Sequence, residues 1–362
     1  MLPTPGTLKF ALPTPCLLID LPMLEANLEG MASFYRDRPA KLRPHYKTHK
    51  CPHIAKMQLE LGAIGITCAK LGEAETLVEA GLTGILIANE VVDPVKIARL
   101  AELASQAYLI VAVDQADNLH QLSRAALEAG TTLDVLVEVD VGLHRCGVRT
   151  REQALELASL ATTLPGVILV GVMGYEGHTV FEKDRERRVE NVRQAMGKLT
   201  ETAELLRLNG LHADIVSAGG TGTFDLTGDY PGVTEIQAGS YPFMDAKYRQ
   251  LGLPFQPALS LLATVISTPE PGLAIIDAGL KAITTDNGLP ELLSPAGVKL
   301  MRLNEEHGIL QVEPDVTLMV GERVELLPSH VCTTVNLHDW YYVLCDGALL
   351  DIWPIAARGK FQ

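Results

Sequence analysis

Short β-branched runs alternate with longer amphipathic runs over residues 40–237, and this rhythm limits the folds open to the chain. The longer runs include GEAETLVEAGL and REQALELASLATTL, in which apolar residues recur at the spacing of an α-helix. Eight such alternations predict an α/β fold, a (β/α)₈ barrel. The rival is an open doubly wound sheet, but no GxGxxG turn follows the first strand. We expect the strands at residues 42–47, 64–68, 85–88, 108–113, 133–139, 168–173, 214–217 and 234–237.

The rhythm changes after about residue 255. Strand-like runs such as LSLLATVIST, LAIIDAGLKAI, HGILQVE and WYYVLCDGALLDIW follow one another without a strong helical pattern between them. We therefore predict a barrel over residues 26–255 and a β-rich domain over residues 256–362. Residues 1–25 are Pro-rich and then strand-like, and we expect them to pack with the β-rich domain.

Charge and composition exclude several classes of partner. The net charge is −14 and the pI about 5.2, and no Lys/Arg cluster is present, which argues against a nucleic-acid or membrane-surface partner. The apolar runs are too short to span a bilayer, and the N-terminal residues lack the pattern of a signal peptide. The six cysteines are scattered, without a CxxC pair. These features predict a cytoplasmic protein with free thiols.

The segment RPHYKTHK at the first strand is the first candidate for chemistry. If the strand alternation holds, Arg43, His45 and Lys47 share the face toward the barrel interior. A desolvated lysine beside other cations has a lowered pKa and suits Schiff-base chemistry. We assign His45 to the same site. The competing interpretation is a basic turn on the surface.

Polar side chains also follow the fifth and sixth strands, at the end where barrels carry their active sites. Arg145 lies after a Gly-containing turn in VEVDVGLHRCGV, where a guanidinium can hold an anionic oxygen. Tyr175, Glu176 and His178 lie in GVMGYEGHTV. The alternatives are a helix-start arginine paired with an acid and a structural histidine.

Glycine-rich loops follow the seventh and eighth strands, the usual phosphate-binding position in barrels. Either loop alone could be a tight turn, but the two together at these strands predict a phosphate site. The residues that we assign to it are Gly220, Thr221 and Gly222 in SAGGTGTFD, and Gly239, Ser240 and Tyr241 in QAGSYPFMD.

His330 and Cys332 lie in PSHVCTTVNLHD, separated by one residue. In a strand they would point the same way, and imidazole plus thiolate suits zinc or another transition metal. Two ligands leave positions for water and substrate, as a catalytic metal needs. The alternative is a buried cysteine beside a polar histidine.

Taken together, RPHYKTHK, the Arg145 segment, AGGTGT, GSYPFMD, HVC and the terminal DIWPIAARG resemble the metal-activated D-threonine aldolase and D-serine dehydratase family. This family belongs to the alanine-racemase-like, fold type III pyridoxal-phosphate enzymes. The resemblance covers nearly the whole chain and implies a barrel, a C-terminal β domain and a head-to-tail homodimer.

The resemblance also implies roles for residues of this chain. Lys47 corresponds to the Schiff-base lysine, and Arg145 to the arginine near the phenolic oxygen of the cofactor. Tyr175 is a candidate neighbour of the pyridine ring. His330 and Cys332 correspond to the ligands of a divalent metal, either zinc or manganese. The two glycine loops correspond to the loops that bind the cofactor phosphate in this family.

The implied activity is that of a pyridoxal-phosphate- and metal-dependent lyase on D-3-hydroxy amino acids. We favour an aldolase that cleaves D-threonine to glycine and acetaldehyde, with His178 as a candidate base. The alternatives are a dehydratase of D-serine, in which Lys47 removes the Cα proton, and an aldolase or dehydratase of D-3-hydroxyaspartate. The cysteine at position 332 of the metal pair slightly favours a dehydratase, whereas the GYEGH segment is more typical of an aldolase. Remoter alternatives are an amino-acid racemase and a non-catalytic pyridoxal-phosphate carrier.

Overall fold

The structure, a computed structural model, describes residues 2–362 and divides into two compact units. The barrel unit contains residues Met31–Lys47, Ile54–Gly239 and Lys360–Gln362. The β unit contains residues 2–30, Thr48–His53 and Ser240–Gly359. None of the helices over residues 2–362 has both the length and the apolar character needed to cross a membrane.

The barrel unit is built on eight parallel strands that pair in the order β2-β9-β8-β7-β6-β5-β4-β3. An isolated parallel bridge between His45 and Thr67 joins the continuation of β2 to β3 and so closes the circle. The predicted (β/α)₈ barrel is therefore confirmed. The strands are β2 (Lys41–Leu42), β3 (Ile66–Cys68), β4 (Ile85–Glu90), β5 (Leu109–Val113), β6 (Leu133–Glu138), β7 (Val167–Met173), β8 (Ile215–Ala218) and β9 (Glu235–Ile236).

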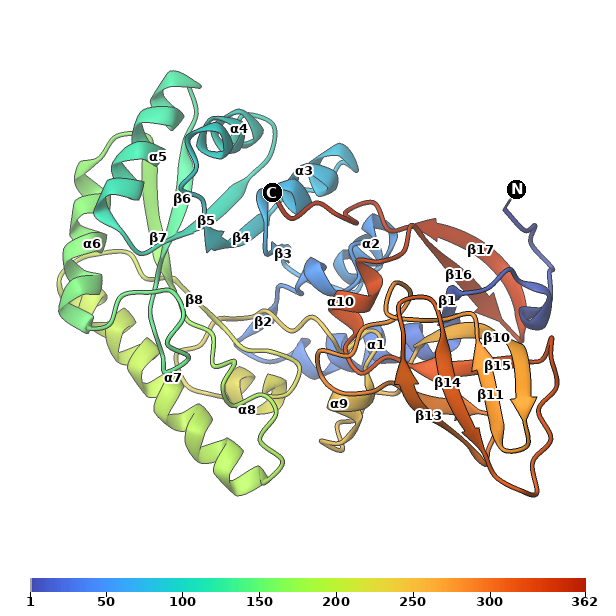
Figure 1. Cartoon of the computed structure of the whole chain (residues 1–362). Helices are drawn as coiled ribbons and strands as arrows, with labels where there is room; N and C mark the ends of the chain where they lie inside the picture. Colours follow the sequence, from blue (N-terminus) through green and yellow to red (C-terminus); the bar gives the residue numbers. More distant parts are fainter. Residues whose placement is uncertain (1) are drawn as a thin grey trace. The chain divides into compact units, whose positions relative to one another are not determined.

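Helices follow the strands and cover the outer face of the sheet, as Figure 1 shows for α5, α6 and α7. Their starts carry side-chain caps: Asp93 and Asp184 accept backbone N–H groups of α4 and α7, and Thr150 forms a capping box at α6. The helices are α1 (Leu21–Tyr35), which ends in this unit, α2 (Pro52–Glu60), α3 (Leu71–Glu79), α4 (Pro94–Ala104), α5 (Ala116–Glu128), α6 (Arg151–Thr163), α7 (Arg185–Leu208) and α8 (Phe224–Gly228).

The first strand is shorter than predicted. It ends at Leu42, and the chain stays extended only to His45, whose N–H donates to Ala238 O at 3.1 Å. Lys47 then lies in a single 3₁₀ turn, η2 (Tyr46–Thr48). The expectation that Arg43, His45 and Lys47 share a strand face was wrong, because strand alternation does not extend through this turn.

Arg43 forms a buried ion pair inside the barrel. Its Nε lies 3.0 Å from Glu235 Oε2, and its Nη1 donates to Gly84 O at 2.7 Å. Gly84 precedes β4 and Glu235 begins β9, so this pair lies at the N-terminal ends of the strands. Arg43 is therefore a structural residue at the end opposite to the strand–helix loops that follow the strands.

The β unit is built on a largely antiparallel sheet in the order β13-β14-β11-β10-β1-β16-β17, with β15 pairing to β10 and β12. β1 lies between β10 and β16, as the blue strand among orange and red ones in Figure 1. The elements are η1 (Lys9–Ala11), β1 (Cys16–Asp20), α9 (Ala246–Arg249), β10 (Leu259–Glu270), β11 (Leu273–Ile276), β12 (Glu291–Ser294), β13 (Val298–Leu303), β14 (Gly308–Val312), β15 (Arg323–Leu327), α10 (Val331–Val335), β16 (Trp340–Cys345) and β17 (Ala348–Pro354).

The division into units differs from the predicted boundaries in four segments: residues 26–30, 48–53 and 240–255 fall in the β unit, and residues 360–362 fall in the barrel unit. Residues 240–255 fall in the β unit, where Ala246 N–H donates to Pro328 O and Asp245 Oδ2 accepts from Val331 N–H. Residues 26–30 also fall there, because Asn27 bonds to the backbone of Pro242 and Gln256. Residue 1 of the predicted N-terminal segment lies outside the described residues. The sequence pattern detects helices and strands, but not these cross-links between distant residues.

The Arg43–Glu235 pair gives a test of the barrel. In Glu235→Leu the buried guanidinium loses its counter-charge, and we expect the free energy of unfolding to fall by about 3–5 kcal/mol. The double variant Arg43→Met/Glu235→Leu buries no charge and should recover most of that loss. Urea unfolding followed by circular dichroism measures both. A double variant that loses at least as much stability as the single variant would contradict this account.

Candidate active site

Tyr175 brings two predicted site residues together. It follows β7, and the Lys47 Nζ and the Arg145 Cζ each lie 5.8 Å from the centre of its ring. Both cations are within the range at which an aromatic ring attracts a positive charge. Lys47 and Arg145 are nearly one hundred positions apart in the chain, so only the closed barrel unites them. The C-terminal strand ends thus carry two cations beside one aromatic ring.

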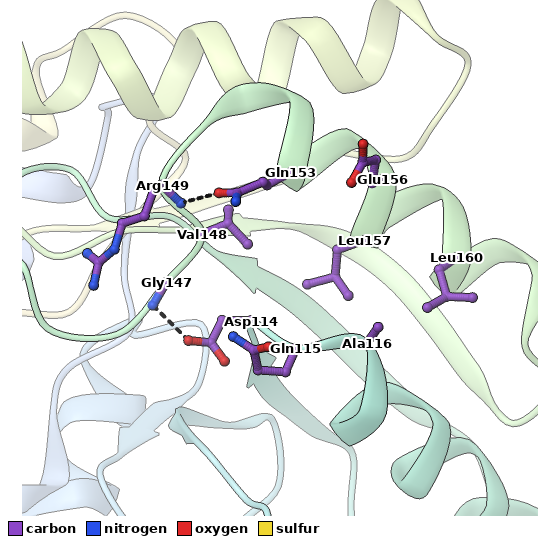
Figure 2. A pocket seen from close by; sticks show the side chains of 10 residues that line it. All are labelled: Asp114, Gln115, Ala116, Gly147, Val148, Arg149, Gln153, Glu156, Leu157 and Leu160. Carbon is purple, nitrogen blue, oxygen red and sulfur yellow. Dashed lines mark hydrogen bonds between the residues drawn. The ribbon is translucent and has the colours of Figure 1, made fainter.

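The loop that carries Arg145 is held at its base. Val139 and Val148 form a parallel bridge, and Asp114 Oδ2 accepts the N–H of Gly147 at 3.0 Å (Figure 2). Inside the loop, Asp140 Oδ1 accepts the N–H groups of Gly142 and His144 at 3.0 and 2.9 Å. These bonds fix the backbone that presents the guanidinium.

The far end of the same loop is fixed to α6. Gln153 Oε1 accepts the N–H of Arg149 at 2.8 Å, as Figure 2 shows, and Arg149 also pairs with Asp140. Arg149 Nη2 donates to Arg145 O at 3.1 Å. These bonds hold both ends of the loop, which favours a preorganised binding site.

Glu138 is a site residue that the sequence analysis missed. It ends β6, is 4% exposed, and its Oε1 lies 3.6 Å from Arg145 Nη2. The carboxylate of Glu90, at the end of β4, is a like charge that acts on this group. Burial, and then the Glu90 charge, raise the pKa of Glu138 well above its ordinary value. The sequence signal that could have identified Glu138 is an acidic residue directly after the apolar run of residues 135–137.

His45 and His178 occupy different settings. His45 is buried, and its Nδ1 lies 3.4 Å from the backbone N of Lys47. His178 is exposed, and its ring lies 3.1 Å from where a Cβ on Gly142 would be. Desolvation lowers the pKa of His178, which favours the neutral form that a general base needs.

The glycine loop after β8 is closely packed against Tyr175 and its neighbours. A Cβ on Gly220 would lie 3.2 Å from the Tyr175 ring, and a Cβ on Gly222 only 2.0 Å from Val180 O. Thr221 is almost fully buried. Glycine is thus required for the backbone to pass here, and side-chain-free amides beside Lys47 and Arg145 fit the phosphate and ring of pyridoxal phosphate.

The loop after β9 contributes mainly backbone. Gly239 ends the barrel unit, and Ser240 begins the β unit, where its carbonyl accepts the N–H groups of Phe243 and Met244. The Tyr241 ring is 1% exposed and packs against Phe255, with ring centres 5.7 Å apart. Tyr241 would therefore bind a phosphate through its backbone and not through its side chain.

The predicted metal pair lies at a helix start in the β unit. His330 is the N-cap of α10 and Cys332 is its second residue, so the expected strand alternation was wrong. The Cys332 thiol lies within hydrogen-bond distance of the Thr48 hydroxyl, with 3.3 Å between Sγ and Oγ1. His330 Nδ1 lies 2.5 Å from Asp286 Oδ2, which leaves Nε2 as the ligand nitrogen.

This donor set fits a divalent metal that also takes water or substrate oxygens. Over residues 2–362, no group of three or more His, Cys, Asp and Glu side chains is arranged to hold a metal ion. His330 and Cys332 would therefore supply two protein ligands, one fewer than the three that catalytic zinc sites usually have.

Two family models match the chain along most of its length. Residues 19–247 match the N-terminal domain of alanine racemase, and residues 258–344 match a serine dehydratase domain. Together they cover the barrel strands and the segment with His330 and Cys332.

Full-length relatives agree with these matches. A D-threonine aldolase of Arthrobacter sp is 45% identical over 98% of this chain and 95% of its own. A 3-hydroxy-D-aspartate aldolase of Paracoccus denitrificans (strain Pd 1222) is 36% identical over the same shares. The crystal structure of D-threonine aldolase from Filomicrobium marinum superposes with a TM-score of 0.96, at 37% identity and 99% coverage of both chains.

The carboxyl pair at β4 and β6 predicts a pH effect on stability. Because the folded-state pKa of Glu138 is raised, its contribution is complete below the unfolded pKa of about 4.3 and is lost as pH rises through the folded value. Glu90→Gln removes the like charge and should reduce this loss. We expect the melting temperature of cofactor-free Glu90→Gln, relative to wild type, to rise by about 3 °C or more between about pH 6 and pH 9.

The control for this experiment is Glu79→Gln, an exposed glutamate at the end of α3. Its melting temperature should follow the wild-type pH curve. Parallel curves for Glu90→Gln and wild type would show that the Glu90 charge does not raise the pKa of Glu138.

Proposed function

The chain belongs to the alanine-racemase-like family of lyases that contains D-threonine aldolases, and from this premise we propose that it cleaves D-threonine to glycine and acetaldehyde. The observation that carries the proposal is the convergence of Lys47 and Arg145 on the Tyr175 ring, beside the glycine loop after β8. The 45% identity to an aldolase supports this choice of reaction.

We assign pyridoxal phosphate to this cluster, with Lys47 as its covalent anchor. When bound, the cofactor supplies an electron sink for the bond that breaks. Tyr175 would lie beside its ring and Arg145 would hold an anionic oxygen, while His45 supports the turn that carries Lys47. The phosphate is assigned to the backbone of Gly220, Thr221 and Gly222, and to Gly239, Ser240 and Tyr241.

His330 and Cys332 would hold the divalent metal, zinc or manganese, which supplies a Lewis acid for the β-hydroxyl oxygen of the substrate. His178 accepts the proton of that hydroxyl in the aldolase reaction, and its lowered pKa keeps it neutral and able to do so. In the alternative dehydratase reaction, Lys47 instead takes the Cα proton. The serine dehydratase match of residues 258–344 supports this second candidate.

The remaining expectations stay proposals. D-3-hydroxyaspartate is the alternative substrate, supported by the 36% identical aldolase. The homodimer rests on the family resemblance, and the cytoplasmic location on the sequence composition.

Product analysis tests the reaction. We expect metal-replete protein to release glycine and acetaldehyde from D-threonine, and EDTA to abolish this release. Pyruvate from D-serine, without glycine from D-threonine, would replace the aldolase with the dehydratase. Retention of full activity in EDTA would contradict the metal assignment.

A pair of cysteine variants tests the metal ligands. Cys332→Ser should lower the D-threonine rate at limiting metal by about 100-fold or more, because the metal loses its thiolate ligand. Cys345→Ser alters another partly exposed free thiol and should keep the wild-type rate. Equal rates for the two variants would rule out Cys332 as a ligand.

A further inference from the structure

We infer that Glu176 is a positioning residue that holds the glycine loop after β8 in its phosphate-binding conformation, and so makes the protein prefer phosphorylated over unphosphorylated pyridoxal. The inference rests on the proposed cofactor site and adds a residue to which that site assigns no role.

Glu176 is fully buried and accepts three hydrogen bonds from the loop and the helix after it. Its Oε2 accepts the N–H of Gly219 at 3.1 Å. Its Oε1 accepts the hydroxyls of Thr223 at 2.6 Å and Thr227 at 2.5 Å. Gly219 lies at the start of the loop, Thr223 at its end and Thr227 on α8, so one carboxylate joins both ends of the loop.

The buried carboxylate of Glu176 depends on these three hydrogen bonds. Among residues 2–362, no cation forms an ion pair with it. A buried carboxylate without a cation is costly unless hydrogen bonds satisfy it. Its three donors are neutral groups of the loop and α8, so the loop cannot open without leaving a buried charge unsatisfied.

The bond from Thr223 to Glu176 also orders the loop interior. The Thr223 hydroxyl donates its hydrogen to Glu176. Its oxygen can therefore accept the N–H of Gly220, at 3.3 Å. In return, Gly220 O accepts the N–H of Thr223 at 3.2 Å. The orientation of the peptide groups around Thr221 and Gly222 thus depends on the carboxylate.

Glu176 also connects the loop to the cation cluster through its neighbour. Tyr175 contacts Lys47 and Arg145, and Gly220 lies against the same ring. The Tyr175–Glu176 dipeptide therefore fixes the two places where the cofactor would be held, the lysine end through Tyr175 and the phosphate end through Glu176.

The test compares two probes, pyridoxal 5′-phosphate and pyridoxal, which differ only in the phosphate group. Glutamine offers one carbonyl oxygen and an amide that donates, so Glu176→Gln cannot satisfy all three donors. Dissociation constants for the cofactor-depleted full chain are measured from the visible absorbance band of the lysine-bound form. We expect Glu176→Gln to raise the constant for pyridoxal phosphate about 10- to 100-fold and that for pyridoxal less than about 3-fold.

Two further variants separate loop positioning from general stability. Thr227→Val keeps the carboxylate and removes one donor, and it should shift the ratio of the two constants in the same direction by a smaller factor. Glu235→Gln is the matched control, because this glutamate is also buried in the barrel unit and lies at the opposite strand ends. It should lower the melting temperature and leave the ratio at the wild-type value.

The inference is overturned if the ratio for Glu176→Gln stays within about 2-fold of wild type, or if Glu235→Gln shifts the ratio as much. A wild-type protein that shows no absorbance band with either probe would remove the proposed cofactor site and this inference with it. A normal wild-type band with an unchanged ratio in Glu176→Gln would remove only the inference.

Discussion

Closure of the parallel sheet is the constraint on which the rest of the candidate site depends. The first strand has only two ladder residues, and the circle closes through a single bridge between His45 and Thr67. Closure places the residues that follow β2, β6, β7 and β8 around one rim. Lys47, Arg145 and Tyr175 meet there although they lie in three distant segments. The 3₁₀ turn that presents Lys47 follows the bridge directly, so the lysine is held by the same backbone that closes the barrel.

Buried carboxylates hold the parts of the candidate site in place. Glu138 Oε1 lies 3.6 Å from Arg145 Nη2, and burial and the Glu90 charge raise the pKa of Glu138, while Glu176 ties the glycine loop to α8. Loss of Glu138 would release the Arg145 guanidinium, and loss of Glu176 would release the glycine loop after β8. At the opposite strand ends, Glu235 pairs with Arg43 and serves the fold alone. The position of an acid along the barrel axis thus separates support of the site from support of the fold.

The sequence predicted the barrel, because eight strand–helix alternations leave few topologies, and it predicted the residue types at the strand ends. It misjudged local geometry where short segments depart from regular strands. Lys47 lies on a 3₁₀ turn and His330 at a helix start, so both residues were selected on alternation arguments that do not apply to them. The role of Glu176 could not be predicted, since its three partners become neighbours only after β7 and β8 pair. Glu138 was missed because its partner Glu90 lies two strands away.

The central claim is that the lysine beside the Tyr175 ring anchors the cofactor. It is tested most directly by reducing the pyridoxal-phosphate-loaded protein with borohydride, digesting it and locating the modified lysine by mass spectrometry. The account predicts stoichiometric modification of Lys47, with Lys41 and Lys50 unmodified, because the Lys47 Nζ lies 5.8 Å from the centre of that ring. Lys50 is buried and donates to Ala357 O, which makes it the internal comparison. Modification of Lys50, or of a surface lysine in place of Lys47, would contradict the account.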